Sequence, residues 1–125
     1  MKKIIITDKA PAPIGPYSQA VLSGNTLYVS GQIALNPANG QLITINIIQE
    51  ANQVMENIGA ILKEAGFDYS NIVKTTIFLK DMQNFQTVNE VYGNYFKDHF
   101  PARETVEVSR LPKDVNVEIS VIACR

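Results

Sequence analysis

The sequence predicts an α+β fold in which one mixed sheet carries two helices on a single face. Two periods of apolar residues indicate this class. Several segments alternate apolar and polar residues, which is typical of half-buried strands. Segments 47–65 and 82–96 instead place apolar residues every three or four positions, as amphipathic helices do. The predicted order is β-β-β-α-β-α-β-β, and we expect residues 1–125 to form a single domain.

Turn-forming residues delimit the predicted strands of the first half. Proline and glycine crowd residues 10–16, which predicts a loop because proline cannot donate to a sheet ladder. Gly24 and Asn25 form a two-residue hairpin signal between YSQAVL and TLYVSGQI, so these two segments are predicted to be antiparallel strands. Residues 36–41 form another turn-rich loop, and Gly66 is the natural C-terminal cap of the helix that follows.

The strand predicted at 71–79 separates the two helices. Its odd-numbered residues, from Val73 to Leu79, are expected on one face, and its even-numbered residues, from Ile72 to Phe78, on the other. Two helices can cover only one face of a sheet this wide, so we expect one face to pack against the helices and the other to carry no helix.

The last two strands, ETVEVSR and VNVEISVIA, are separated by the turn sequence LPKD, which predicts an antiparallel pair. Pro101 is expected to fix where the first of them begins, and Val106 and Val108 to anchor it in the core. Under this prediction Arg103 and Glu118 lie within a few residues of each other across the ladder, on one sheet or across a subunit joint.

The uncovered sheet face predicts an oligomer. On the last strand the residues of this face are Asn116, Glu118, Ser120, Ile122 and Cys124. A fully solvated face would not need such apolar residues, so we expect it to pack against other copies of the chain. The alternative is a monomer with a few exposed apolar residues, which is ordinary.

Composition narrows the function. Hydrophobic residues make up 46% of the chain and charged residues 18%, as in globular proteins, and the net charge of -1 gives no basic field, so no nucleic acid partner is expected. With one cysteine (Cys124) and one histidine (His99), the chain cannot form an internal disulfide or a Cys/His zinc site. A metal site made of carboxylates alone stays formally possible, but no acidic cluster indicates one. Nucleotide-binding glycine motifs and a nucleophile elbow are missing.

The opening MKKIIITDKAPAP has an apolar run too short for a signal peptide, and no stretch reaches the length of a membrane span. A cytoplasmic location is therefore expected.

Arg103 and Glu118 are the residues with the clearest chemical potential. Arg103 stands at the start of a strand, where it either joins a surface ion pair of little energetic value or binds a substrate carboxylate through two parallel hydrogen bonds. Glu118 lies within an apolar strand, where it either faces solvent, pairs with Arg103, or orients and deprotonates a water molecule.

Other residues each have a structural and a functional interpretation. Tyr17 is a packed aromatic residue or the wall of a ligand site. Ser30 and Gly31 form a bulge or turn, or expose a glycine amide to a ligand. Asn89 is a solvated helix residue unless it faces a site. Cys124 and His99 are expected to be chemically inert.

Four segments together resemble the reactive intermediate deaminase (Rid, YjgF-type) family: IGPYSQA, YVSGQI, VKTTIFLKDMQNFQTVNEVY and FPARETVEVSRLPKDVNVEISVIA. The last segment is the most specific, because it keeps the arginine of the deaminating branch. The resemblance implies a chorismate-mutase-like fold and a homotrimer with clefts between subunits. It also implies hydrolysis of 2-iminobutanoate and 2-iminopropanoate, released by pyridoxal-phosphate enzymes, to 2-oxo acids and ammonia, without a cofactor or metal.

The resemblance also assigns roles to residues. Arg103 would hold the substrate carboxylate and Glu118 would position the hydrolytic water. The cleft would be lined by Tyr17, Ser30, Gly31, Asn89 and Thr105.

Thr105 stands where many relatives have cysteine. A threonine without a neighbouring base is a poor nucleophile, so this position is expected to act through its backbone.

Three other functions stay open at this point. The first is a module that binds small 2-oxo acids without turnover. The second is RNA cleavage or inhibition of translation, as described for some relatives, although the chain lacks a basic patch and a histidine pair. The third is a chaperone-like role in stress.

Overall fold

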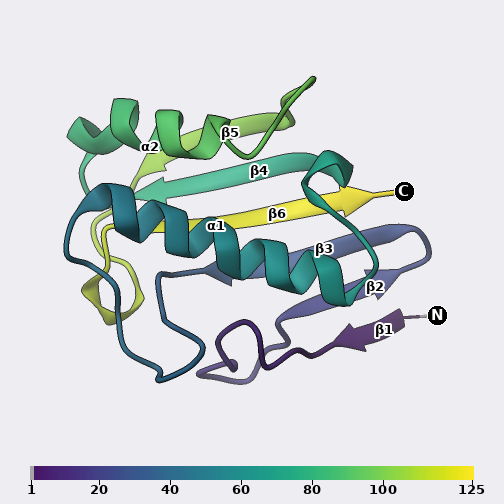
Figure 1. The fold of residues 1–125 in the computed structure, drawn as a ribbon. Helices are drawn as coiled ribbons and strands as arrows, with labels where there is room; N and C mark the ends of the chain where they lie inside the picture. Colours follow the sequence, from purple (N-terminus) through teal and green to yellow (C-terminus); the bar gives the residue numbers. More distant parts are fainter. Residues whose placement is uncertain (1) are drawn as a thin grey trace.

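The computed structural model describes residues 2–125 and has the α+β architecture that the sequence predicts. A six-stranded mixed sheet carries two α-helices on one face, while the other face bears no helix (Figure 1). The elements are β1 (Lys2–Ile5), β2 (Ala20–Ser23), β3 (Thr26–Gln32), α1 (Ile47–Glu64), η1 (Tyr69–Asn71), β4 (Ile72–Leu79), η2 (Met82–Asn84), α2 (Phe85–Gly93), β5 (Ala102–Glu107), η3 (Pro112–Asp114) and β6 (Val117–Cys124). Their order confirms the predicted β-β-β-α-β-α-β-β.

The strands lie in the order β1-β2-β3-β6-β4-β5. All neighbours are antiparallel except β4 and β5, which are parallel. The predicted hairpin between β2 and β3 is confirmed, and Gly24 at its turn has a φ of 60°, a conformation that glycine adopts at little cost. The C-terminal strand β6 is thus central, between β3 and β4.

Helix α1 follows the predicted apolar stripe. Asn46 caps its start, since its side-chain oxygen accepts a hydrogen bond from the backbone N–H of Gln49. Its last turn leads into Gly66, whose φ of 81° confirms the expected glycine stop. The second helix is shorter than predicted, because Met82–Asn84 form a 3₁₀ turn and α2 ends at Gly93.

The predicted antiparallel pair of final strands is wrong. Strand β5 pairs in parallel with β4, and β4 separates β5 from β6. The reason is α2, which connects β4 to β5 across the helical face of the sheet, so that the two strands run in the same direction (Figure 1).

The predicted side-chain faces also need two corrections. A register irregularity between Ile72 and Lys74 puts Ile72 in the core and leaves Val73 47% exposed, the reverse of the prediction. Val106 is 41% exposed and does not anchor β5, while Val108 is half-buried. Strand β5 does begin directly after Pro101, as expected.

The core lies between the sheet and the two helices, where β6 contributes Val117, Ile119, Val121 and Ala123. The opposite sheet face bears no helix and is partly apolar: Tyr28 of β3 is 51% exposed, and Val73 of β4 and Val106 of β5 are also exposed. Helices within residues 2–125 are all too short or too polar to cross a membrane.

Candidate functional site

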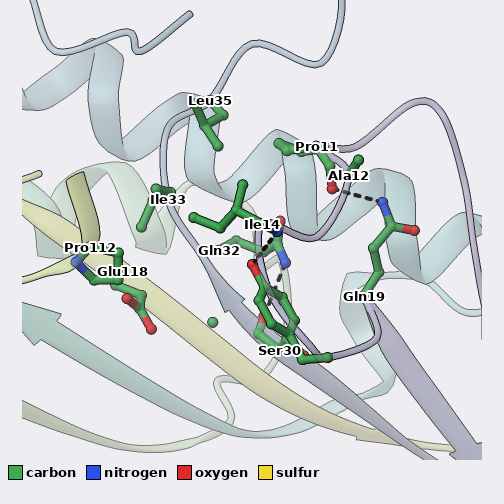
Figure 2. A pocket seen from close by; sticks show the side chains of 12 residues that line it. Pro11, Ala12, Ile14, Gln19, Ser30, Gln32, Ile33, Leu35, Pro112 and Glu118 are labelled. Atoms are coloured by element: carbon green, nitrogen blue, oxygen red, sulfur yellow. Dashed lines mark hydrogen bonds between the residues drawn. The ribbon is translucent and has the colours of Figure 1, made fainter. Parts of the chain in front are cut away.

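A cavity of about 330 Å³ opens where β3 and β6 separate. Glu118 and Pro112 lie on one side of it and the loop residues Pro11, Ala12 and Gln19 on the other (Figure 2). We call it the Glu118 pocket. Its lining residues are Pro11, Ala12, Ile14, Tyr17, Gln19, Ser30, Gly31, Gln32, Ile33, Leu35, Pro112 and Glu118. Four of the residues predicted for the site, Tyr17, Ser30, Gly31 and Glu118, therefore share one pocket.

Glu118 is the only acidic residue of this pocket. Its side chain is half-buried on the open face of β6, and within residues 2–125 its carboxylate accepts no hydrogen bond and joins no ion pair. Burial raises the pKa of the Glu118 carboxyl above its ordinary value, because an apolar setting disfavours the charged form. A carboxyl group in this condition is suited to exchange protons with a bound molecule.

Gly31 gives the Glu118 carboxyl the room it occupies. A Cβ atom added at Gly31 would lie 2.8 Å from Glu118 Cδ, well inside van der Waals contact. Gly31 lies at the register irregularity between Val29 and Gln32, so a bulge brings bare backbone against the carboxylate. This confirms the sequence interpretation of Ser30-Gly31 as a bulge and adds a reason for the glycine.

A well-fixed loop forms the outer wall of the pocket. Gln19, 2% exposed, accepts a hydrogen bond from the N–H of Thr7 and donates to the carbonyls of Thr7, Ala10 and Pro11. Tyr17 is 46% exposed, and its hydroxyl accepts a hydrogen bond from the N–H of Ile14. The loop therefore holds Tyr17 at the rim, where its ring is open to a ligand.

Ser30 is less available than predicted. Its hydroxyl donates to the carbonyl of Ser18 at 2.6 Å, so it ties the loop to β3. The carbonyl of Ser30 accepts from the side chain of Gln32, a further polar lining residue.

Arg103 lies at the opposite edge of the sheet, on the helical face. Its guanidinium stands 5.3 Å from the ring centroid of Tyr92 and 5.7 Å from that of Phe85, both on α2. The cation–π contacts with these rings hold the side chain in place while leaving its N–H groups free to bind an anion. Ion pairs recorded for residues 2–125 do not include Arg103, so the predicted alternative of a surface salt bridge does not hold within the chain.

Asn89 and Thr105 accompany Arg103. Asn89 lies four residues after Phe85 and three before Tyr92, which places it on the same face of α2. Thr105 is two residues beyond Arg103 on β5 and so shares its sheet face. Its hydroxyl is buried without a hydrogen-bond partner in the described structure. We call Arg103, Thr105 and Asn89 the Arg103 group.

The Glu118 pocket and the Arg103 group do not meet within one chain. In the strand register Arg103 lies opposite Thr75 of β4, and Glu118 lies opposite Phe78 of the same strand. Thr75 and Phe78 point to opposite faces of the sheet, and so do Arg103 and Glu118. The backbones of Arg103 and Glu118 are separated by two strand spacings, roughly 10 Å, and by a further 10 Å or so along the strands. The predicted proximity across a ladder is therefore wrong within one sheet.

Two buried polar residues of α1, Glu50 and Asn57, were not predicted from the sequence to have a role. They are 0% and 1% exposed and bind the backbone on the two sides of the Glu118 pocket. A signal was available, because both fall within the apolar stripe of the helix, where a polar residue needs a buried partner. Among residues 2–125, no three histidine, cysteine, aspartate or glutamate side chains gather as a metal site would require.

Comparison with known proteins decides the family. The family model described as endoribonuclease L-PSP matches residues 7–125. The chain belongs to this family, which includes the Rid proteins. A human protein named 2-iminobutanoate/2-iminopropanoate deaminase is 50% identical over 98% of this chain and 90% of its own length.

Solved Rid-family structures share the whole fold. A Yersinia pestis protein of the conserved Rid family is 50% identical, covers 100% of both chains and superposes with a TM-score of 0.97. Escherichia coli TdcF with bound serine is 42% identical over 98% of both chains, with a TM-score of 0.95. The resemblance noted in the sequence is thereby confirmed at the level of the family.

Proposed function

We propose that this Rid-family chain is a deaminase that hydrolyses 2-iminobutanoate and 2-iminopropanoate to 2-oxo acids and ammonia, without a cofactor. The observation that carries the proposal is the Glu118 pocket: one carboxyl group that makes no hydrogen bond or ion pair with residues 2–125, in a small and largely apolar cavity. The mammalian relatives that bear this activity in their names are 50–54% identical over 98% of the chain.

The chemistry needs few groups. In our proposal the substrate is the protonated imine. Glu118 holds a water molecule against the imine carbon and accepts one proton from it as the C–O bond forms and the C=N bond becomes single. Glu118 then gives this proton to the nitrogen; the C–N bond breaks, ammonia leaves, and Glu118 takes the proton of the new hydroxyl group as the C–O bond becomes the carbonyl of the 2-oxo acid. That last proton passes to the departing ammonia, which restores the carboxylate. A raised pKa suits a carboxyl that both accepts and returns a proton. Ile14, Ile33 and Leu35 offer an apolar wall to a short alkyl side chain.

A complete site requires a second copy of the chain. We propose that the protein is a homotrimer in which the Arg103 group of one subunit meets the Glu118 pocket of the next, so that Arg103 binds the substrate carboxylate. Asn89 and the backbone of Thr105 line the same cleft. Three features support this: the two groups lie on opposite faces of one sheet, Arg103 has no acidic partner within residues 2–125, and the open sheet face exposes apolar residues.

The test is a coupled assay. A threonine dehydratase generates 2-iminobutanoate in the presence of semicarbazide, and active deaminase lowers the yield of the trapped semicarbazone. Arg103→Ala should reduce kcat/KM by about a hundredfold or more, because a desolvated carboxylate loses its bidentate partner. Arg110→Ala, a change of an exposed loop arginine, is the matched control and should keep full activity.

Two results would reject the proposal. If the wild type leaves semicarbazone formation unchanged, the protein is not an imine deaminase, and binding of 2-oxobutanoate by that inactive protein would favour the non-catalytic alternative. If Arg103→Ala matches the wild type, Arg103 does not hold the substrate.

A further inference from the structure

The Glu118 pocket exists because β3 and β6 separate. The two strands pair from Thr26↔Cys124 to Gln32↔Ile119, with a register irregularity before the last pair. Beyond it, residues 33–35 turn away, and Leu35 forms an isolated bridge with Leu42 instead. The separation deprives backbone N–H and C=O groups of their sheet partners beside the pocket, and such groups are costly when buried and unpaired.

Glu50 satisfies the N–H groups on the β6 side. Its Oε2 accepts hydrogen bonds from the backbone N–H of Asn116 at 2.8 Å and of Val117 at 3.2 Å, and its Oε1 accepts from Asn116 Nδ2 at 2.8 Å. No ion pair in residues 2–125 includes Glu50. Three donors and the positive end of α1, in whose first turn it lies, offset the cost of burying this carboxylate.

Asn57 satisfies the C=O groups on the β3 side. Its Nδ2 donates to the carbonyls of Ile33 at 3.1 Å and Leu35 at 2.9 Å, and its Oδ1 accepts from the side chain of Gln53. Glu50 and Asn57 lie two turns apart on one face of α1, so a single rigid helix contacts the backbone of both pocket walls. Neither side chain lines the cavity itself.

We propose that Glu50 and Asn57 are positioning residues that hold the two walls of the Glu118 pocket apart. Glu50 fixes the start of β6 and thereby the place of Glu118, one residue beyond Val117. Asn57 fixes the wall of Ile33 and Leu35, which meets the alkyl side chain of the substrate. This inference rests on the proposed deaminase function and adds to it a division of labour: Glu50 governs the rate of hydrolysis and Asn57 the choice of side chain.

The role of Glu50 is tested by a substitution that disturbs its hydrogen bonds and a second substitution that restores them. Asn116→Asp places a carboxylate against Glu50 Oε1 and should push the start of β6 away, lowering kcat about tenfold or more with little change in KM. Adding Glu50→Gln restores a donor, since the introduced amide N–H donates to the introduced carboxylate while the amide oxygen accepts from the backbone. The double variant should recover kcat to within about threefold of the wild type. Hydrogen exchange at the Val117 amide should quicken in the single variant and slow again in the double variant.

The role of Asn57 is tested by comparing the KM values for the two imine substrates. Asn57→Ala removes the two hydrogen bonds that the Asn57 side chain donates to the Ile33–Leu35 wall and leaves the carbonyl of Ile33 with the N–H of Leu35 alone. It should raise KM for 2-iminobutanoate about tenfold and for 2-iminopropanoate much less, because the longer side chain depends more on that wall. Asn52→Ala is the matched control on the same helix: its side chain binds Ile48 and Tyr95, away from the pocket, and its KM values should not change.

The outcomes separate the inference from the function on which it rests. A wild type without turnover rejects the deaminase, and the hydrogen-exchange data alone then decide whether Glu50 holds β6. Unchanged exchange at Val117 in Asn116→Asp overturns the inference in every case. If the wild type is active, two results would reduce Glu50 to a structural role. In the first, Asn116→Asp exchanges faster at Val117 but keeps the kcat of the wild type. In the second, the double variant does not recover kcat. Equal KM changes for both imines in Asn57→Ala overturn the selectivity claim.

Discussion

Substitution of Gly31 by alanine tests whether the position of the Glu118 carboxyl matters for turnover. The backbone of Gly31 does not have a positive φ, so alanine introduces no conformational strain there. Its methyl group, however, would lie 2.8 Å from Glu118 Cδ. An ordinary carbon–carbon contact is about 3.5–4.0 Å, so the carboxyl group must move by about 1 Å.

This displacement sets the expected size of the effect. A shift of about 1 Å in a catalytic group can cost about a hundredfold in rate, so kcat should fall by about that factor. The free energy of unfolding should change by less than about 1 kcal/mol, because the displaced group is the end of a flexible side chain beside an open cavity.

The coupled semicarbazide assay measures the loss, and urea unfolding measures the stability. Gly24→Ala is a contrasting control: its φ of 60° disfavours alanine, while nothing lies within 4 Å of the added methyl. It should lower stability by about 1 kcal/mol and leave activity intact. If Gly31→Ala keeps the kcat of the wild type, the carboxyl position seen in the structure is not the one that acts in catalysis.

Two further predictions concern charge and burial. Glu118→Gln should abolish turnover yet raise Tm at neutral pH. Burial raises the pKa of Glu118 in the folded protein, so the wild type loses stability as the pH rises from the unfolded towards and beyond the folded pKa of this group. The neutral amide avoids that loss. Thermal unfolding at several pH values would contradict this if the gain were largest in acid. Tyr92→Phe removes the hydrogen bond to the buried Thr75 hydroxyl but keeps the ring beside Arg103. Urea unfolding should therefore show that the free energy of unfolding falls by about 1–2 kcal/mol, while the deaminase activity stays within a few-fold of the wild type. A large loss of activity would assign Tyr92 to the site.

The local elements could be predicted because each has a pattern of its own. The alternation of Val117 to Ala123 and the stripe of α1 reflect burial on one side, and Gly24 and Gly66 mark conformations that few other residues adopt. Glu118 and Gly31 of the Glu118 pocket could be singled out for the same reason, since a glutamate in an apolar strand and a glycine beside a strand end are both locally unusual, whereas most of the lining residues carry no such signal.

The pairing of the strands could not be read from such local signals. The turn sequence LPKD suggested a hairpin, but strand–helix–strand connections favour parallel neighbours, and α2 brings β5 beside β4. Arg103 consequently lies on the other side of the sheet from Glu118. The apolar stripe of α1 could show that Glu50 and Asn57 need buried partners, but not which backbone groups they bind, because that depends on where β3 leaves β6.

The central claim is that Arg103 and Glu118 act together from different copies of the chain. The most direct test mixes two inactive variants, Arg103→Ala and Glu118→Gln, by co-expression or joint refolding in equal amounts. If each site takes its arginine from one subunit and its glutamate from another, about a quarter of the sites regain both residues, and about a quarter of wild-type activity should return. Activity no higher than that of either variant alone would contradict the account.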